Sequence, residues 1–159
     1  METASRGIQV PEPLDEEPAI EDEAGLIQEY DPLAAPDPAE WLSLGEQERI
    51  DLIMDYHRRA GIRVPNAALH AAMHGIVENQ IAEGDELPAL RTAQRLIAEG
   101  LDRHDAIHAI GTELAAHINN LAREVRLGLK PDKRDVDRDP NDAYFAELER
   151  LTAEQWLRS

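Results

Sequence analysis

The chain has 159 residues, a formal net charge of −17 and no cysteine. This length suits one ordinary domain with extensions. Without cysteine there are no disulfides, thiolate zinc sites or cysteine nucleophiles, so a bound metal would need nitrogen or oxygen ligands. The negative charge argues against nucleic acid and anionic membranes as partners, because phosphate is bound mainly through lysine and arginine. No secretory signal and no membrane-spanning stretch is found, so the sequence predicts a cytoplasmic protein.

The N-terminal segment, residues 1–40, is strongly acidic. It contains twelve acidic residues, one arginine and six of the ten prolines. With few large apolar side chains it cannot bury enough surface to offset the entropy cost of ordering, which predicts a disordered tail. The alternative hypothesis is a partner-binding segment centred on residues 24–30, whose apolar side chains stand out from their surroundings.

Residues 41–128 are predicted to form a helical domain. Ser43 and Glu46 have the spacing of a capping box, which predicts the start of the first helix. Asn66 and Asp102 are typical N-caps for two later helices. The four main helices predicted in this domain cover residues 43–59, 67–82, 88–99 and 103–127.

Residues 129–159 are expected to form a linker and a C-terminal helix. Residues 130–139 alternate charges around a proline, which is typical of an exposed connection. A short helix is predicted to open at Asp139 and Pro140, and Thr152 with Gln155 predicts one further turn. No alternating β pattern is present, so the fold class is all-α. We expect a compact bundle of about four helices with an acidic tail and a short C-terminal helix.

The histidines are the most distinctive feature of the chain. All six lie between residues 57 and 117. Random placement would give about 0.2 pairs at a spacing of four, and two are present. Residues four apart lie on one face of a helix, so two such helices could bring four imidazoles to one point. The pairs are His70 with His74, and His104 with His108.

The surroundings of both pairs also suit a site. His70 lies inside the apolar stripe of its helix and His74 at its edge, and the second pair has the same kind of position. Gly111 and Ala115 leave space for another helix or for an exogenous ligand. Glu78 continues the line of the first pair and is a fifth candidate ligand. His57 falls on the apolar side of its helix, as a further ligand, a proton shuttle or a core residue, whereas His117 is expected at the surface.

These donors predict a divalent transition metal, zinc or iron, because neutral imidazole binds such ions. If all four paired histidines bind it, the metal is structural and the protein is not an enzyme. If fewer bind it, an open position permits hydrolytic or redox chemistry, with Glu78 or Glu113 as base. No His-Glu-x-x-His motif, glycine-rich phosphate loop or repeated Glu-x-x-His motif is present.

Two segments share a pattern with other sequences: Leu69-His70-Ala71-Ala72-Met73-His74, with Gln80 after it, and Asp102-Arg103-His104-Asp105-Ala106-Ile107-His108, with Glu113 beyond it. Through them the stretch from Asn66 to about Leu129 resembles a bacterial family known only as a domain of unknown function. The resemblance implies no activity. It does imply that the histidine pairs, Gln80 and Glu113 form one recurring pattern in similar chains, which fits a site better than unrelated core contacts.

The rival hypothesis is a metal-free interaction or regulatory module. In it the histidines would be hydrogen-bonded core residues, and the acidic tail would bind a basic protein partner. A homo-oligomer is also compatible with the sequence, and a homodimer could divide a metal site between its subunits.

Overall fold

The structure is a computed structural model that describes residues 27–129 and 138–159. Throughout these residues the regular elements are helices and no strand occurs, which confirms the all-α prediction. The elements are α1 (Pro38–Ser43), α2 (Glu46–Arg59), α3 (Ala67–Ala82), the 3₁₀ turn η1 (Gly84–Glu86), α4 (Pro88–Ala98), α5 (Arg103–Arg126), α6 (Asp142–Arg150) and α7 (Ala153–Leu157).

The two helices that carry the histidine pairs begin at the predicted caps. The side chain of Asn66 accepts the backbone N–H of Leu69 at the start of α3. The side chain of Asp102 accepts the N–H of Asp105 at the start of α5. These bonds satisfy N–H groups that a helix end leaves without a partner, so both helices are fixed locally.

The predicted capping box at Ser43 is wrong. Ser43 ends the short helix α1, and its hydroxyl donates to the carbonyl of Glu40 at 2.7 Å. The next helix, α2, begins instead after Gly45, whose N–H donates to the carboxylate of Glu48 at 2.6 Å. The reason is an earlier start signal: the Asp37 side chain caps α1, and a proline occupies its first position.

The predicted tail boundary at residue 40 is also wrong. Tyr30 and Trp41 are buried with their ring centroids 5.4 Å apart, and Arg103 donates to the carbonyl of Pro32 at 2.8 Å. Part of residues 27–40 therefore packs on the helices, because the Tyr30 side chain and the Pro32 carbonyl find partners there. The earlier part of the predicted tail, residues 1–26, lies outside the described residues, as does most of the predicted linker.

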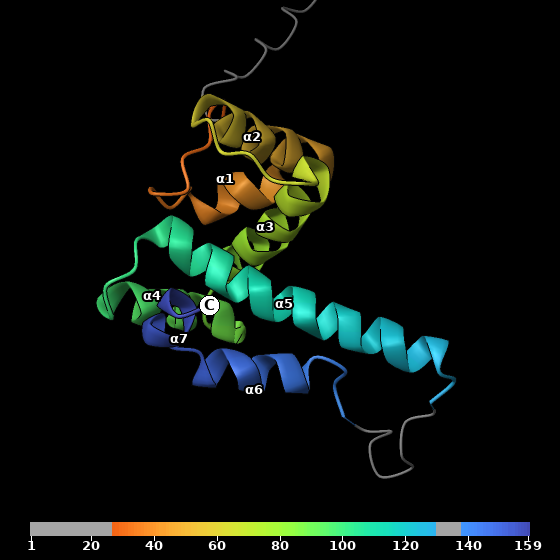
Figure 1. Ribbon diagram of the computed structural model, residues 1–159. Helices are drawn as coiled ribbons and strands as arrows, with labels where there is room; N and C mark the ends of the chain where they lie inside the picture. Colours follow the sequence, from red (N-terminus) through yellow and green to blue (C-terminus); the bar gives the residue numbers. More distant parts are fainter. Residues whose placement is uncertain (1–26, 130–137) are drawn as a thin grey trace, which may run out of the picture.

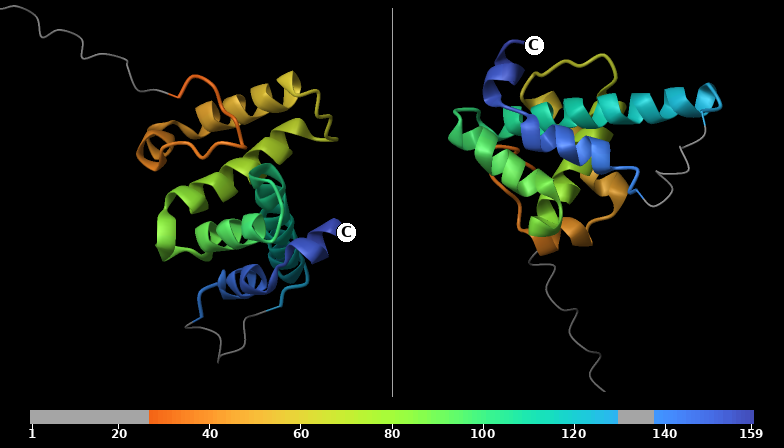
Figure 2. Two further views of the ribbon diagram at one scale, coloured as in Figure 1. Left: turned by 90° about the vertical axis from the view of Figure 1, so that its left-hand side faces the viewer. Right: turned by 90° about the horizontal axis from the view of Figure 1, so that it is seen from below.

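Helix α3 lies at the centre of the fold. It contacts α1 and α2 on one side and α4 and α5 on the other, and α6 packs on α4 and α5 (Figures 1 and 2). One hydrophobic cluster, which includes Val77, Leu96 and Ile107, fills the space among α3, α4, α5 and α6. A second, around Trp41 and Ile53, joins α2 and α3. The histidine-bearing faces of α2, α3 and α5 meet between these two clusters.

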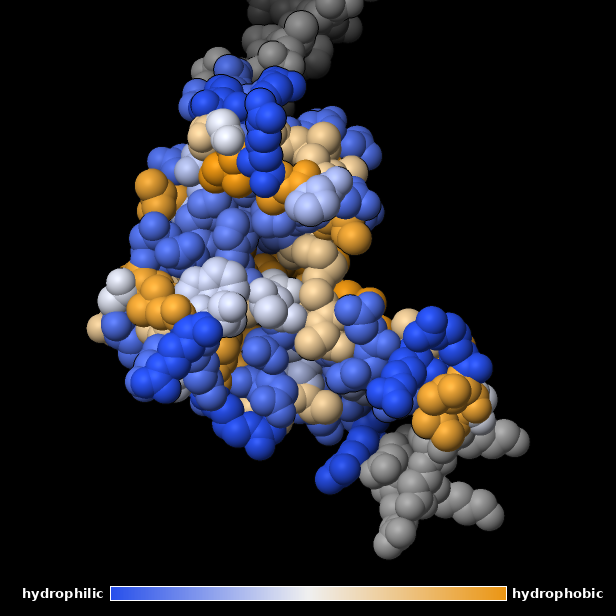
Figure 3. Space-filling view, in the orientation of Figure 1, coloured by the Kyte–Doolittle hydropathy of each residue, from blue (hydrophilic) through white to orange (hydrophobic). Residues whose placement is uncertain are grey.

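The last part of α5 extends beyond the bundle (Figure 1). Val125 and Leu127 are exposed at this end. Figure 3 shows a face on which hydrophilic surface is interspersed with hydrophobic patches. In the part of the chain that the structure describes, no helix combines the length and apolar character needed to cross a bilayer.

Candidate metal centre

Five histidines from three helices converge in one cluster, which we call the histidine cluster. Their ring centroids lie 4.1 to 6.2 Å apart in the pairs that are in contact. Four of them, all except His104, each offer one ligand nitrogen, and these nitrogens lie within 4.8 Å of one another, so the group could hold a metal ion. The cluster consists of His57 from α2, His70 and His74 from α3, and His104 and His108 from α5.

His57 is the hub of the cluster. Its Nδ1 lies 2.8 Å from the carbonyl of Ile53, and a carbonyl can only accept, so this nitrogen carries the proton. In neutral His57 the other nitrogen, Nε2, then presents a single lone pair. Two ring nitrogens lie against it: Nε2 of His70 at 3.2 Å and Nε2 of His104 at 3.3 Å. One lone pair can accept only one of them well, so three ring nitrogens are crowded at this point.

These nitrogen separations match the geometry of a zinc site. With Zn–N bonds of 2.0–2.1 Å, neighbouring nitrogens of a tetrahedral site lie about 3.3 Å apart. The contacts of His57 with His70 and His104 are 3.2 and 3.3 Å. These two contacts have the spacing of neighbouring ligands in a zinc site, whereas the four nitrogens of the candidate group lie within a wider limit of 4.8 Å.

A chain of buried hydrogen bonds sets the tautomer of His74. The Tyr30 hydroxyl donates to Glu78 in a very short bond and lies 2.8 Å from Nε2 of His74. Since its proton is used on Glu78, the hydroxyl accepts from His74, whose Nε2 must be protonated. The Nδ1 of His74 is then a bare lone pair; it is buried and lacks a hydrogen-bond partner among the described residues. Nε2 of His108 is also buried without a hydrogen-bond partner among the described residues.

The structure places Glu78 beside the cluster, in a supporting position. Its side chain is 1 % exposed, and its two oxygens accept from the guanidinium of Arg103, both at 2.7 Å. One of the same oxygens accepts from Tyr30. Glu78 is therefore occupied by Arg103 and Tyr30 and is not part of the group of four. It supports His74 through Tyr30, the role that carboxylates commonly have behind a metal-bound histidine.

The surroundings lower the pKa of four histidines of the cluster, His70, His74, His104 and His108, and so favour their neutral forms. Burial, followed by the neighbouring histidines, lowers the pKa of His74 well below its usual value. The same causes lower the pKa of His108 to about 3, and that of His104, which is opposed in part by Asp102 and Asp31, to about 4. The pKa of His70 is lowered by burial and by His57. Neutral imidazole is the form that binds metal, so no proton has to be displaced first.

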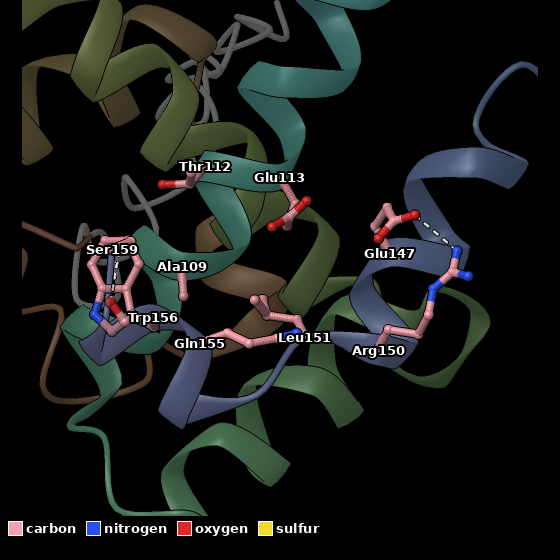
Figure 4. Close-up of a pocket in the computed structure, with 9 residues that line it drawn as sticks. All are labelled: Ala109, Thr112, Glu113, Glu147, Arg150, Leu151, Gln155, Trp156 and Ser159. Carbon is pink, nitrogen blue, oxygen red and sulfur yellow. Dashed lines mark hydrogen bonds and ion pairs between the residues drawn. The ribbon is translucent and has the colours of Figure 1, made fainter.

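Glu113, the second predicted base, lines a different pocket. This pocket, of about 280 Å³, lies between α5, α6 and α7, and Figure 4 shows Glu113 in it with Glu147 and Arg150. Burial and the nearby Glu147 raise the pKa of Glu113. Glu113 therefore faces the carboxyl-terminal helices, and the structure does not bring it into the histidine cluster.

His117 was expected at the surface, and this expectation is wrong. It is 9 % exposed, and its ring stacks on Tyr144 with centroids 5.7 Å apart. The hydroxyl of Tyr144 donates to Gln80 at 2.7 Å, so Gln80 serves this contact between α3 and α6. Helix α6 covers a side of α5 that lies outside the apolar stripe of α5, so the stripe alone does not predict that His117 is buried.

Comparison of the chain with protein-family models, with curated proteins and with solved structures gives no match. The resemblance drawn from the histidine motifs therefore stays a prediction. The case for a function depends on the histidine cluster itself.

Proposed function

We propose that this protein binds one divalent transition metal ion through the histidine cluster, with zinc as the best fit to its ligands. The observation that carries the proposal is the crowding at His57: two further ring nitrogens lie within 3.3 Å of a nitrogen that has one lone pair. A cation bound at this point would relieve the crowding, because ring nitrogens could then donate their lone pairs to it as ligands.

Two unpartnered nitrogens support the same conclusion. Nδ1 of His74 and Nε2 of His108 are buried without a hydrogen bond in the described residues. A buried polar group without a partner costs about 1–3 kcal/mol. In a metal-free core these two nitrogens would have no partner among the described residues, whereas coordination would give each of them one. The metal-free reading therefore fits this structure less well.

The ligand type favours zinc over iron. Mononuclear non-haem iron sites typically combine two histidines with a carboxylate, and diiron bundles use several glutamates. Here the candidate ligands are imidazole nitrogens, and the nearest expected carboxylate, Glu78, is held by Arg103. Imidazole also binds copper and nickel, so metal analysis has to cover all four elements.

Elemental analysis of protein purified without a histidine tag tests the proposal. We expect close to one equivalent of metal per chain. The double variant His70→Ala/His108→Ala should lose it. His117→Ala is the matched control, because this histidine is also buried but lies outside the cluster. If the wild type carries no stoichiometric metal after exposure to zinc, or if the double variant keeps it, the proposal is wrong.

Chelation gives a second, independent test. Binding to the folded state alone adds about 2.7 kcal/mol of stability at a free metal concentration a hundred times the Kd. We therefore expect a chelator to lower the thermal unfolding midpoint of the wild type and to leave that of His70→Ala/His108→Ala unchanged. An unfolding midpoint that does not respond to the chelator in either protein contradicts tight binding.

A further inference from the structure

A pocket of about 330 Å³ opens directly beside the histidine cluster. It lies between α3 and α5 and is covered by Trp156 of α7. Three of the four histidines in the candidate metal group line it, whereas His57 and His104 do not. Its wall consists of His70, Met73, His74, Ile107, His108, Gly111, Thr112, Ala115 and Trp156.

The wall away from the histidines is apolar. Met73, Ile107, Ala115 and Trp156 contribute hydrocarbon or aromatic surface, and no Asp, Glu, Lys or Arg side chain of the described residues lines the pocket. Its volume is at the lower end of the range of about 300–1,000 Å³ that is usual for small-molecule sites. The pocket therefore suits a small ligand with an uncharged, apolar body.

Small residues on α5 keep this pocket open. A Cβ added at Gly111 would meet only Val77, at 3.9 Å, which is ordinary van der Waals contact. Close packing of α3 against α5 therefore does not require glycine at this position. The missing side chain at Gly111 and the single methyl group of Ala115 instead leave space next to the imidazoles.

The charge balance of the cluster favours an anionic head group. Neutral imidazoles would leave the full charge of a divalent metal in place, and the buried carboxylate behind them, Glu78, is already paired with Arg103. A half-buried dication is stabilised by an anion in contact with it. Zinc sites with three protein ligands keep a position for an exogenous ligand and can expand to five ligands, and three histidines of the candidate group line the pocket, so its side of the cluster can receive one.

We propose that the pocket binds a small monocarboxylate with an apolar chain, whose carboxylate oxygen coordinates the metal and whose chain fills the space between Trp156 and α5. This inference rests on the proposed function, because it requires the metal. It names a class of ligand for the site. It also places this ligand on the side of the cluster that faces the pocket, away from His57.

Cobalt-substituted protein provides the test, because the visible absorption of Co²⁺ responds to its ligands. Acetate, butyrate and hexanoate are titrated in turn. Hexanamide, which has the same chain as hexanoate but no charge, is the control. We expect each acid to change the spectrum, and affinity to rise by about fourfold per methylene, as expected for burying CH₂ groups. Hexanamide should bind at least tenfold more weakly than hexanoate.

Two neighbouring alanines on α5 give matched variants. Ala115→Leu places a larger side chain in the pocket, whereas Ala116→Leu adds the same side chain at an exposed position. We expect Ala115→Leu to abolish the gain in affinity from acetate to hexanoate while keeping one equivalent of cobalt. Ala116→Leu should behave as wild type. Trp156→Ala, which removes the cover, should weaken hexanoate more than acetate.

The outcomes separate this proposal from the one before it. If cobalt and zinc do not bind, the proposed function itself fails and the pocket proposal fails with it. If the metal binds but no acid changes the spectrum, or chain length has no effect, or Ala115→Leu and Ala116→Leu respond alike, the pocket proposal alone is overturned and metal binding stands.

Discussion

The hydroxyl of Tyr30 lies 2.8 Å from Nε2 of His74, which is 44 residues further along the chain. The same hydroxyl donates its proton to Glu78. Burial, followed by the charge of Glu78, raises the pKa of Tyr30, so the hydroxyl stays protonated and keeps donating to the carboxylate. A residue of the acidic N-terminal segment thus decides which nitrogen of His74 is free to bind a metal.

Replacement of this hydroxyl should weaken metal binding without removing a ligand. In Tyr30→Phe, Nε2 of His74 loses its acceptor and its tautomer is no longer fixed. Loss of such an outer hydrogen bond typically lowers metal affinity by about 10–100-fold. Competition with a zinc chelator of known affinity measures the change.

Tyr56→Phe is the control for that substitution. Tyr56 makes edge contacts with Tyr30, His57 and His104. The substitution therefore removes a hydroxyl from the same aromatic surroundings. We expect its zinc affinity to stay within a few-fold of wild type. Equal losses in the two variants would show that the Tyr30 hydroxyl has no special role.

The buried ion pair of Glu78 and Arg103 should be important for stability. Their side chains are 1 % and 11 % exposed, so Arg103→Ala would leave a buried carboxylate without its cation. Breaking such a pair costs about 3–5 kcal/mol. Denaturant unfolding in the presence of a chelator measures this loss separately from metal binding.

An exposed ion pair gives the contrast. Arg91 and Glu149 pair at the surface, with side chains about half exposed. Pairs of this kind contribute about 0–1 kcal/mol, so Arg91→Ala should change the free energy of unfolding by less than Arg103→Ala does. Similar losses for the two variants would contradict the role assigned to burial.

The metal-free protein should lose stability as the pH falls below about 6.5, the usual pKa of histidine. In the folded state the pKa of His104 is about 4 and that of His108 about 3. At a pH between these folded-state pKa values and 6.5, these histidines are protonated in the unfolded chain and remain neutral in the folded chain. This contribution to stability is complete above about pH 6.5 and decreases steadily toward pH 4.

The variant His108→Gln isolates this effect, since glutamine does not titrate. Denaturant unfolding with a chelator, measured at pH 7.5, 6.5, 5.5 and 4.5, should give a smaller decrease for the variant than for wild type. Identical pH profiles would mean that His108 is not held neutral by the fold.

The local features of the chain were predictable. Asn66 and Asp102 cap the helices as expected, and the spacing of His70 with His74 and of His104 with His108 places each pair on one helical face. These features depend on residues within a few positions of one another. Helical periodicity and capping chemistry report such short-range relationships directly.

The partners of the cluster were not predictable in the same way. Tyr30 and Arg103 reach Glu78 over 48 and 25 residues, and nothing in local periodicity ranks one distant hydrogen-bond partner above another. His57 was recognised as inward-facing, but its place as the hub depends on how α2 crosses α3. His117 was misplaced because the stripe on α5 does not reveal that α6 covers a second side of that helix.

The docking of residues 30–32 on α3 and α5 has a practical consequence for truncation. A chain shortened to start at α1 would retain every histidine and each helix that bears one. It would nevertheless lose the phenol that orients His74 and the carbonyl of Pro32 that receives Arg103. Trimming to the helical boundaries would therefore keep the histidines but remove two of the contacts that hold His74 and Arg103 in place.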